Sequence, residues 1–328
     1  DPAARIESLR ALEAAISASE GEICQALQAD LGKAPLEAYM TEIGMVLEEL
    51  RYQIRHVRAF SRPRRVRTPL MHFPAVSRVY PEPYGLVLVM APWNYPFQLS
   101  LEPLIGALAA GNCVVLKPSN YAPHTARAME ALLNRALPRE LVRVVQGGRK
   151  ENAALLDTRF DSIFFTGGGT VGRLVMEKAA QFLTPVTLEL GGKSANIFFE
   201  DCDWDRALDG LQLGILFNQG QVCCAGSRVF VHEDIYDKFV AEAVAAFNKV
   251  KVGMPWDPET QMGSQINQAQ LGKILDYIDI GVREGATIAC GGKRATGGDL
   301  DKGCFMQPTL LTNVTNNMRV AQEEIFGP

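Results

Sequence analysis

The segment Gly85-Leu86-Val87-Leu88-Val89-Met90 is a short, continuous run of apolar side chains that begins with a glycine. Three similar runs follow it, at Cys113–Lys117, Leu141–Val145 and Ser162–Thr166. Between them lie stretches typical of helices, near 99–110, 124–136 and 170–182. Short apolar strands that alternate with helices are typical of a parallel sheet covered on both faces. We therefore predict an α/β fold with a doubly wound parallel sheet.

The segments before this pattern have a different character. Apolar residues recur at three- and four-residue spacing through the first 60 residues, which predicts helices, with Gly32 and Pro35 between two helical stretches. Residues 68–83 contain four prolines around a short apolar run. Proline cannot donate to a sheet ladder, so this segment suits an edge strand or a protruding hairpin.

Composition limits the classes of function. The chain has 328 residues, 47% of them hydrophobic, and a net charge of -4, which suits two globular domains and gives no reason to expect nucleic acid or an anionic membrane as a partner. No apolar stretch approaches the roughly 20 residues that span a bilayer, and the N-terminus lacks a signal-peptide pattern. We therefore expect a cytoplasmic protein without a membrane partner.

The cysteines and histidines do not form a metal or disulfide pattern. There are seven cysteines, an odd number, spread along a long chain, which argues against a disulfide framework and favours a reducing compartment. The sequence has no C-x-x-C pair, and its four histidines lie far apart. We expect no metal site.

Two adjacent cysteines, Cys223 and Cys224, stand in the segment Phe217–Gly226 among glycine and amide side chains. Backbone N–H groups in such a loop can hold a thiolate, so one cysteine could act as a nucleophile. The alternative is a pair of buried structural cysteines, since free cysteine is among the most buried residue types. This segment alone does not decide between the two.

The segment Thr166-Gly167-Gly168-Gly169-Thr170-Val171-Gly172 follows the last of the four strands and contains G-x-G-x-x-G. It leads into a helix that we expect by Arg173, and its backbone N–H groups could receive a pyrophosphate. A glycine-rich turn with a purely steric purpose is the alternative. The acidic residue expected about 20 residues on in a dinucleotide fold has only a nominal candidate, Glu189, within a different-looking segment.

Taken together, six segments resemble motifs of the NAD(P)-dependent aldehyde dehydrogenase superfamily, in the family's order and spacing. They are Pro92-Trp93-Asn94-Tyr95-Pro96, Lys117-Pro118-Ser119, Phe165-Thr166-Gly167 with Gly172, Glu189-Leu190-Gly191-Gly192-Lys193, Gly220-Gln221-Val222-Cys223 and Glu323-Glu324-Ile325-Phe326-Gly327-Pro328. Each motif alone is modest, but the set is specific, and the resemblance covers essentially the whole chain.

The resemblance implies an aldehyde-dehydrogenase-like fold with two domains. Residues 1–190 would form the coenzyme-binding domain, with an oligomerisation-type hairpin at 68–83 inserted, and residues 191–328 the catalytic domain. Relatives continue beyond the motif that ends at Pro328, so we expect the catalytic domain and the oligomerisation region to be incomplete at the C-terminus. A homo-oligomer would then be altered by the missing segment.

The resemblance also implies the catalytic residues. Cys223 would be the nucleophile and Cys224 a small packed neighbour. The Asn94 side-chain amide and the Cys223 backbone N–H would hold the oxyanion, and Glu189 would act as general base for the hydrolytic water.

For the cofactor, NAD or NADP, the resemblance assigns Lys117 to the adenosine ribose and Glu324 and Phe326 to the nicotinamide ribose and ring. The other cofactor-binding residues would be Trp93, Ser119, Asn120, Thr166, Gly167, Gly168 and Gly172. Many NAD-preferring relatives have glutamate where this chain has Asn120. Because a neutral amide does not repel a 2′-phosphate, we expect NADP to be tolerated.

The implied function is oxidation of a small-molecule aldehyde to a carboxylic acid through a cysteine thiohemiacetal and thioester. One alternative is a folded, catalytically crippled fragment that binds nucleotide or self-associates. Another is a CoA-acylating semialdehyde dehydrogenase, against which Glu189 argues, since a base positioned for water favours hydrolysis.

Overall fold

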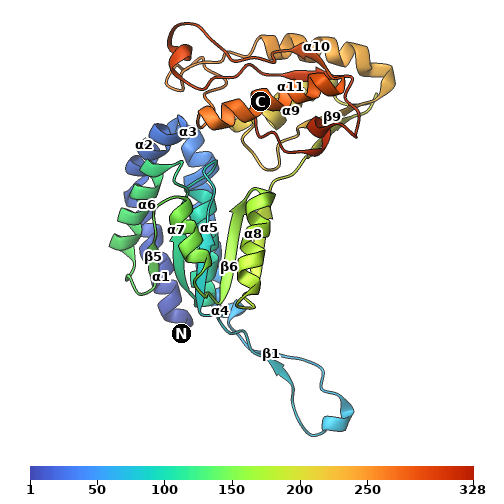
Figure 1. Ribbon diagram of the computed structural model, residues 1–328. Helices are drawn as coiled ribbons and strands as arrows, with labels where there is room; N and C mark the ends of the chain where they lie inside the picture. The colour runs from blue at the N-terminus through green and yellow to red at the C-terminus, as the bar shows by residue number, and fades with distance from the viewer. The chain divides into compact units, whose positions relative to one another are not determined.

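The computed structural model describes all 328 residues, Asp1–Pro328, and these divide into two compact units, Asp1–Glu189 and Leu190–Pro328. Figure 1 shows the elements of each unit along the chain. No helix in the structure is both long enough and apolar enough to cross a membrane.

The first unit is built on a five-stranded sheet with the strand order β5-β4-β3-β6-β7. Its strands are β3 (Leu86–Met90), β4 (Cys113–Lys117), β5 (Val142–Val144), β6 (Ser162–Gly167) and β7 (Val186–Leu190). β3 pairs in parallel with both β4 and β6, and β4 pairs in parallel with β5. The four predicted strands and their parallel arrangement are confirmed.

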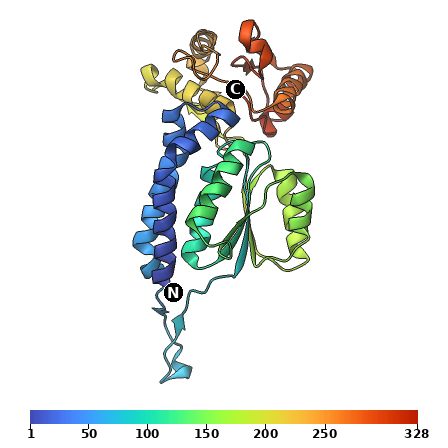
Figure 2. The ribbon, with the colours of Figure 1, turned by 90° about the vertical axis from the view of Figure 1, so that its left-hand side faces the viewer.

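Helices cover both faces of this sheet, because alternate residues of the central strands point in opposite directions. Val87 and Val89 of β3 belong to a core shared with α5 (Gln98–Ala110) and α6 (Pro123–Ala136). Leu88 and Met90 belong to a second core, shared with α7 (Arg149–Leu156) and α8 (Gly169–Ala180). Figure 2 shows the sheet between its helical layers. The predicted doubly wound fold is therefore confirmed.

The N-terminal helices pack on the first of these faces and extend the larger core. They are α1 (Pro2–Ala18), α2 (Glu20–Leu31), α3 (Pro35–Ala38), a π-helical turn at Tyr39–Ile43 and α4 (Gly44–Phe60). The apolar stripe of α1, with Ile6, Leu9, Leu12 and Ile16, lies buried in that core. The helical prediction is correct, although it missed the break at Ser19 between α1 and α2.

The proline-containing segment forms a small antiparallel ribbon separate from the five-stranded sheet. Its strands are β1 (Arg64–Arg65) and β2 (Arg78–Val79). A hairpin is thus present, but its first strand precedes the predicted range 68–83, because the prolines lie outside the paired residues: Pro69 and Pro74 in the loop, and Pro81 and Pro83 after β2. Most of its side chains are exposed.

Two elements of the first unit were not predicted. Helix α7 buries only Leu156, so it lacks the apolar periodicity by which helices are recognised. Strand β7 includes Glu189, and its Val-Thr-Leu-Glu-Leu sequence alternates in the manner of a strand.

The second unit combines helices with two small sheets. Its helices are α9 (Trp204–Leu216), α10 (Tyr236–Asn248), α11 (Gln268–Glu284) and α12 (Arg319–Gln322). Strands β8 (Ala195–Phe198) and β9 (Arg228–Val231) pair in parallel, and β10 (Thr287–Cys290) and β11 (Leu310–Thr312) pair antiparallel. A core that includes Leu211, Phe239 and Phe247 joins α9 to α10.

Candidate active site

Several predicted residues lie at or just beyond the carboxyl ends of neighbouring parallel strands. Trp93 and Asn94 follow β3, Lys117 ends β4, and Thr166 and Gly167 end β6. The Ala91 N–H donates to the Lys117 carbonyl (3.1 Å), which ties the ends of β3 and β4 together. This edge of an open α/β sheet is where ligands usually bind.

Lys117 is buried, and its ammonium donates to the Pro118 carbonyl (2.7 Å). Burial lowers the pKa of Lys117, and the nearby Glu151 carboxylate opposes that shift. The two residues that follow are less enclosed: Ser119 accepts from the Tyr121 N–H (3.2 Å), and Asn120 is exposed. A β-carbon on Gly148, the residue before α7, would lie 3.8 Å from the Asn120 amide nitrogen. Asn120 is therefore accessible beside the start of α7.

The glycine-rich segment forms a strand–turn–helix, as predicted. β6 ends at Gly167, and α8 begins at Gly169, one residue before the helical stretch predicted near 170–182 and four before Arg173. Glycine is needed where β6 ends, since a β-carbon on Gly167 would lie 2.6 Å from the Phe165 ring. The Gly172 N–H already donates to the Gly168 carbonyl (3.0 Å). Gly172 therefore has no backbone donor left for a ligand, whereas the N–H groups at the start of a helix have no partner within that helix.

Asn94 and Glu189 have contrasting surroundings. Asn94 is only 3% exposed, in the loop between β3 and α5. Glu189 is exposed on β7.

In the second unit, Cys223 follows an unusual turn. Asn218, Gln219 and Gly220 all have positive φ angles (47°, 56° and 73°), a region that costs energy for residues other than glycine. Amide side chains hold this turn. The Asn218 and Gln221 side chains donate to each other's carbonyl oxygens (3.2 Å each), and the Gln221 Oε1 accepts from the Ile266 N–H (3.0 Å). The amide-rich sequence before the cysteines is thus a structural lock for their loop.

Both adjacent cysteines are exposed, which excludes the interpretation of a buried structural pair. The expectation that Cys224 is packed is also wrong; its loop lies on the surface of the unit. Although Cys223 is exposed as a residue, partial burial of its sulfur raises the pKa of the thiol, and Cys224 and Glu324 add to that rise. The N–H groups of Cys224 and Cys223 oppose it by hydrogen bonding to the sulfur. The loop therefore offers two backbone donors to a Cys223 thiolate.

Three motifs meet beside Cys223 within this unit. A β-carbon on Gly192 would lie 3.5 Å from the Cys223 carbonyl oxygen, and one on Gly191 would overlap the Glu324 carboxylate. That carboxylate also accepts from the Gly192 N–H. Gly220 is in contact with the backbone of Gly327, since a β-carbon there would overlap the Gly327 carbonyl.

Glu324 has one carboxylate oxygen without a partner. Its Oε1 is buried and accepts no hydrogen bond within the protein. Burial raises the pKa of Glu324, whereas Lys273, the Gly192 N–H and Lys193 lower it. A buried acceptor without a donor is costly unless a ligand or water supplies one.

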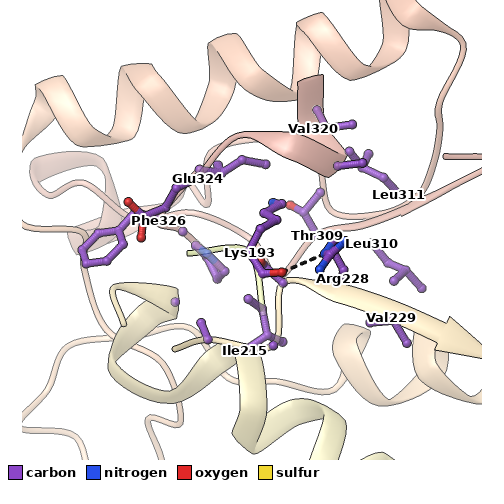
Figure 3. Close-up of a pocket in the computed structure, with 18 of the residues that line it drawn as sticks. Lys193, Ile215, Arg228, Val229, Thr309, Leu310, Leu311, Val320, Glu324 and Phe326 are labelled. Carbon is purple, nitrogen blue, oxygen red and sulfur yellow. Dashed lines mark hydrogen bonds between the residues drawn. The ribbon is translucent and has the colours of Figure 1, made fainter. Parts of the chain in front are cut away.

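A cavity of about 260 Å³ lies in the second unit, and Glu324 and Phe326 line it (Figure 3). Apolar side chains, including Ile215, Leu311 and Val320, line other parts of its wall. Its charged members also include Lys193 and Arg228, and the Arg228 Nε donates to the Lys193 carbonyl (2.7 Å). Burial, with Arg228, lowers the pKa of Lys193 to about 8. Cys223 itself does not line the cavity.

The sequence-predicted residues thus form two groups. Ten lie in the first unit: Trp93, Asn94, Lys117, Ser119, Asn120, Thr166, Gly167, Gly168, Gly172 and Glu189. Three lie in the second, where Cys223 is close to Glu324 and Phe326 lies on the cavity wall. Sequence reasoning gave no role to Lys193 or Arg228. Lys193 could have been found, because it ends the Glu189–Lys193 motif, whereas Arg228 carries no local signal.

The structure has no cluster of three or more His, Cys, Asp and Glu side chains that could hold a metal ion. All seven cysteines are free.

Comparisons with known proteins agree with this arrangement. The chain is 37% identical over 324 residues to a 4,4'-diaponeurosporen-aldehyde dehydrogenase of Staphylococcus aureus. This match covers 99% of this chain and 69% of that protein. It is 40% identical over 308 residues to an aldehyde dehydrogenase of Rhodospirillum rubrum, and this match covers 91% of this chain and 60% of the relative.

Among solved structures, the NAD+ complex of an aldehyde dehydrogenase from Bacillus cereus matches all of this chain and 66% of its own, with a TM-score of 0.92 and 35% identity. The chain thus spans about three fifths to seven tenths of the length of these proteins. The model of the aldehyde dehydrogenase family matches residues 1–328. The fold, the motifs and these matches together show that the chain belongs to the aldehyde dehydrogenase family.

Proposed function

We propose that this chain oxidises an aldehyde to a carboxylic acid with NAD+ or NADP+, with Cys223 as the nucleophile. The observation that carries the proposal is the Cys223 loop: the thiol belongs to an exposed residue, the backbone N–H groups of Cys223 and Cys224 favour its thiolate against the effect of burial on its pKa, and the Glu324 carboxylate is nearby. Donors that stabilise a thiolate are what a cysteine nucleophile requires.

The residues present fit a dinucleotide. The unpartnered Glu324 Oε1 is an acceptor suited to a ribose hydroxyl, and Phe326 lies on the wall of the same cavity. In the first unit, the start of α8 at Gly168 offers N–H groups to a pyrophosphate. Lys117, with Ser119 and Asn120, would bind the adenosine ribose, and Trp93 and Thr166 would line the site. When bound, the nicotinamide supplies the acceptor for a hydride.

The chain's own residues would act in sequence. The Cys223 sulfur attacks the aldehyde carbon, and the resulting oxyanion accepts hydrogen bonds from the Asn94 amide and the Cys223 N–H. After the carbon has lost its hydrogen as hydride, a thioester to Cys223 remains. Glu189 takes a proton from water, the water oxygen bonds to the acyl carbon, and the carbon–sulfur bond breaks to release the acid and the Cys223 thiolate.

Gly167 and Gly172 would contribute by shape. Neither residue has a side chain that could bind the cofactor. Gly172 is buried inside α8, where its N–H donates to the Gly168 carbonyl within the helix. We therefore assign Gly172 to the packing of the helix that faces the pyrophosphate.

The test is NAD(P)H formation from a panel of aldehydes by this chain, with Cys223→Ala and the matched control Cys224→Ala. The two variants are matched, because both remove an exposed thiol from the same loop. We expect C223A to abolish turnover, since it removes the nucleophile, and C224A to retain it. Turnover that survives in C223A would refute the thiol mechanism.

The same assay separates the alternatives. Acyl-CoA rather than acid as the product, with CoA present, would indicate a CoA-acylating enzyme. Bound nucleotide without turnover would favour the catalytically crippled chain.

A further inference from the structure

A buried ion pair in the first unit has no role in the function proposed above. The Lys33 ammonium lies 2.5 Å from the Glu42 Oε1, and the two side chains are 1% and 0% exposed. In every other ion pair of the structure, each side chain is at least 27% exposed. Burying two charges costs desolvation energy, so such a pair rarely serves stability alone.

The second oxygen of Glu42 binds the start of α5. Its Oε2 accepts from the Phe97 N–H (2.7 Å) and the Gln98 N–H (3.1 Å). These are among the first N–H groups of the helix, which have no partner within it, and a carboxylate there also interacts favourably with the helix dipole. Glu42 therefore acts as a remote cap that fixes where α5 begins.

Lys33 binds the loop that precedes this helix. Its ammonium donates to the Asn94 carbonyl (3.3 Å) and lies 4.1 Å from the centre of the Tyr95 ring. The pair thus holds the segment 94–98 at both ends: Lys33 at Asn94, and Glu42 at Phe97 and Gln98. The contacts all involve buried or half-buried groups, which strengthens them relative to surface contacts.

We propose that the Lys33–Glu42 pair positions Asn94 for oxyanion stabilisation. This inference rests on the proposed function, in which the Asn94 amide is an oxyanion donor. Lys33 and Glu42 are positioning residues: they act through the backbone of 94–98 and do not touch the substrate. A donor must lie within a narrow distance of the oxyanion, and misplacement by about 1 Å can cost on the order of 100-fold in rate.

The test compares two reactions of the Cys223 thiol, neither of which needs a cofactor. With 4-nitrophenyl acetate, the sulfur attacks the ester carbonyl, an oxyanion forms, and 4-nitrophenolate leaves as the acyl–sulfur bond is completed. With iodoacetamide, the sulfur displaces iodide at a saturated carbon, and no oxyanion forms. The ratio of the two rates therefore reports oxyanion stabilisation apart from thiol reactivity.

The variants are Asn94→Ala as reference, the neutral double variant Lys33→Met with Glu42→Gln, and Glu42→Asp. The double variant removes both charges of the buried pair together, and with them the opposing effects of Lys33 and Glu42 on the neighbouring Glu37. E42D keeps the charge but shortens the side chain by one methylene, so it serves if the double variant does not fold. Lys178→Met is the matched control, because it removes an exposed ion pair with Asp157 in the same unit.

We expect N94A to lower the acylation rate by roughly 100-fold, and the double variant and E42D by about tenfold or more. Alkylation should stay within about twofold, and K178M should change neither rate. Circular dichroism and thermal unfolding identify the variants that are folded.

An acylation rate within twofold of wild type in a folded pair variant, while N94A loses it, would overturn this inference and leave the proposed function intact. If N94A itself acylates normally, the oxyanion role of Asn94 fails, and the inference fails with it. Equal losses in acylation and alkylation would also overturn the inference, because they indicate a general loss of thiol reactivity.

Discussion

Gly191→Ala should weaken cofactor binding by adding a single methyl group. Gly191 does not have a positive φ, so its backbone accepts alanine without strain. The new β-carbon, however, would overlap the Glu324 carboxylate by more than 1 Å relative to ordinary carbon contact of about 3.5 Å. Glu324 must therefore move away and give up its hydrogen bond from the Gly192 N–H.

The magnitude follows from that lost contact. A hydrogen bond to a charged group contributes about 1.5–3 kcal/mol, and each 1.4 kcal/mol corresponds to about tenfold in affinity. If the Glu324 Oε1 receives a ribose hydroxyl, its displacement should raise the Kd for NAD+ or NADP+ by roughly 10- to 100-fold. Glu324→Ala should produce a loss at least as large.

Isothermal titration calorimetry of the chain with each nucleotide measures the effect. The matched control is Gly210→Ala, which adds the same methyl group in the same unit where no atom lies within 4 Å. A Kd for folded G191A within twofold of wild type would refute the reasoning that Glu324 binds the cofactor from its present position.

Three further predictions concern other parts of the chain. Asn120→Glu should lower affinity for NADP+ by about tenfold or more, because a carboxylate repels the 2′-phosphate, with little effect on NAD+; titration with both nucleotides measures this. Lys193, with a pKa of about 8 instead of 10.5, binds fewer protons in the folded state than in the unfolded state, so it should make stability rise between about pH 8 and 10.5. In urea unfolding, Lys193→Met should remove that rise, which is at most about 3.4 kcal/mol. Leu88→Ala, at a fully buried site on the central strand, should cost about 2–5 kcal/mol in guanidinium unfolding.

Each of these has an outcome that contradicts it. Unchanged discrimination in N120E would place the 2′-position away from residue 120. The same pH dependence in K193M as in wild type would mean that other groups cause the rise. A loss below about 1 kcal/mol in L88A would mean that the core closes around the missing side chain.

The sequence by itself determined the sheet and the family. Apart from the exposed Leu86, the apolar runs at Leu86–Met90 and Cys113–Lys117 are buried or half-buried on both faces in the structure, and such runs predict a parallel sheet because no alternation with polar residues is needed. The turn at Gly167–Gly169 was likewise recognisable as a glycine-rich segment between a strand and a helix, and Gly167 leaves room for the Phe165 ring. Local pattern suffices wherever the controlling interaction is between near neighbours in the chain.

Only the tertiary structure decided how distant residues combine. Gly191 leaves room for the Glu324 carboxylate, and Glu324 is partly buried, because segments more than 100 residues apart in the chain pack together. The exposure of Cys224 depends on the surface of the folded unit, which local pattern does not reveal. The pairing of Lys33 with Glu42, and of Glu42 with the N–H groups of Phe97 and Gln98, has the same origin. Charged residues in or between helical stretches normally predict a solvated surface. Two of them form a buried pair only when packing brings partners to both charges, which periodicity cannot show.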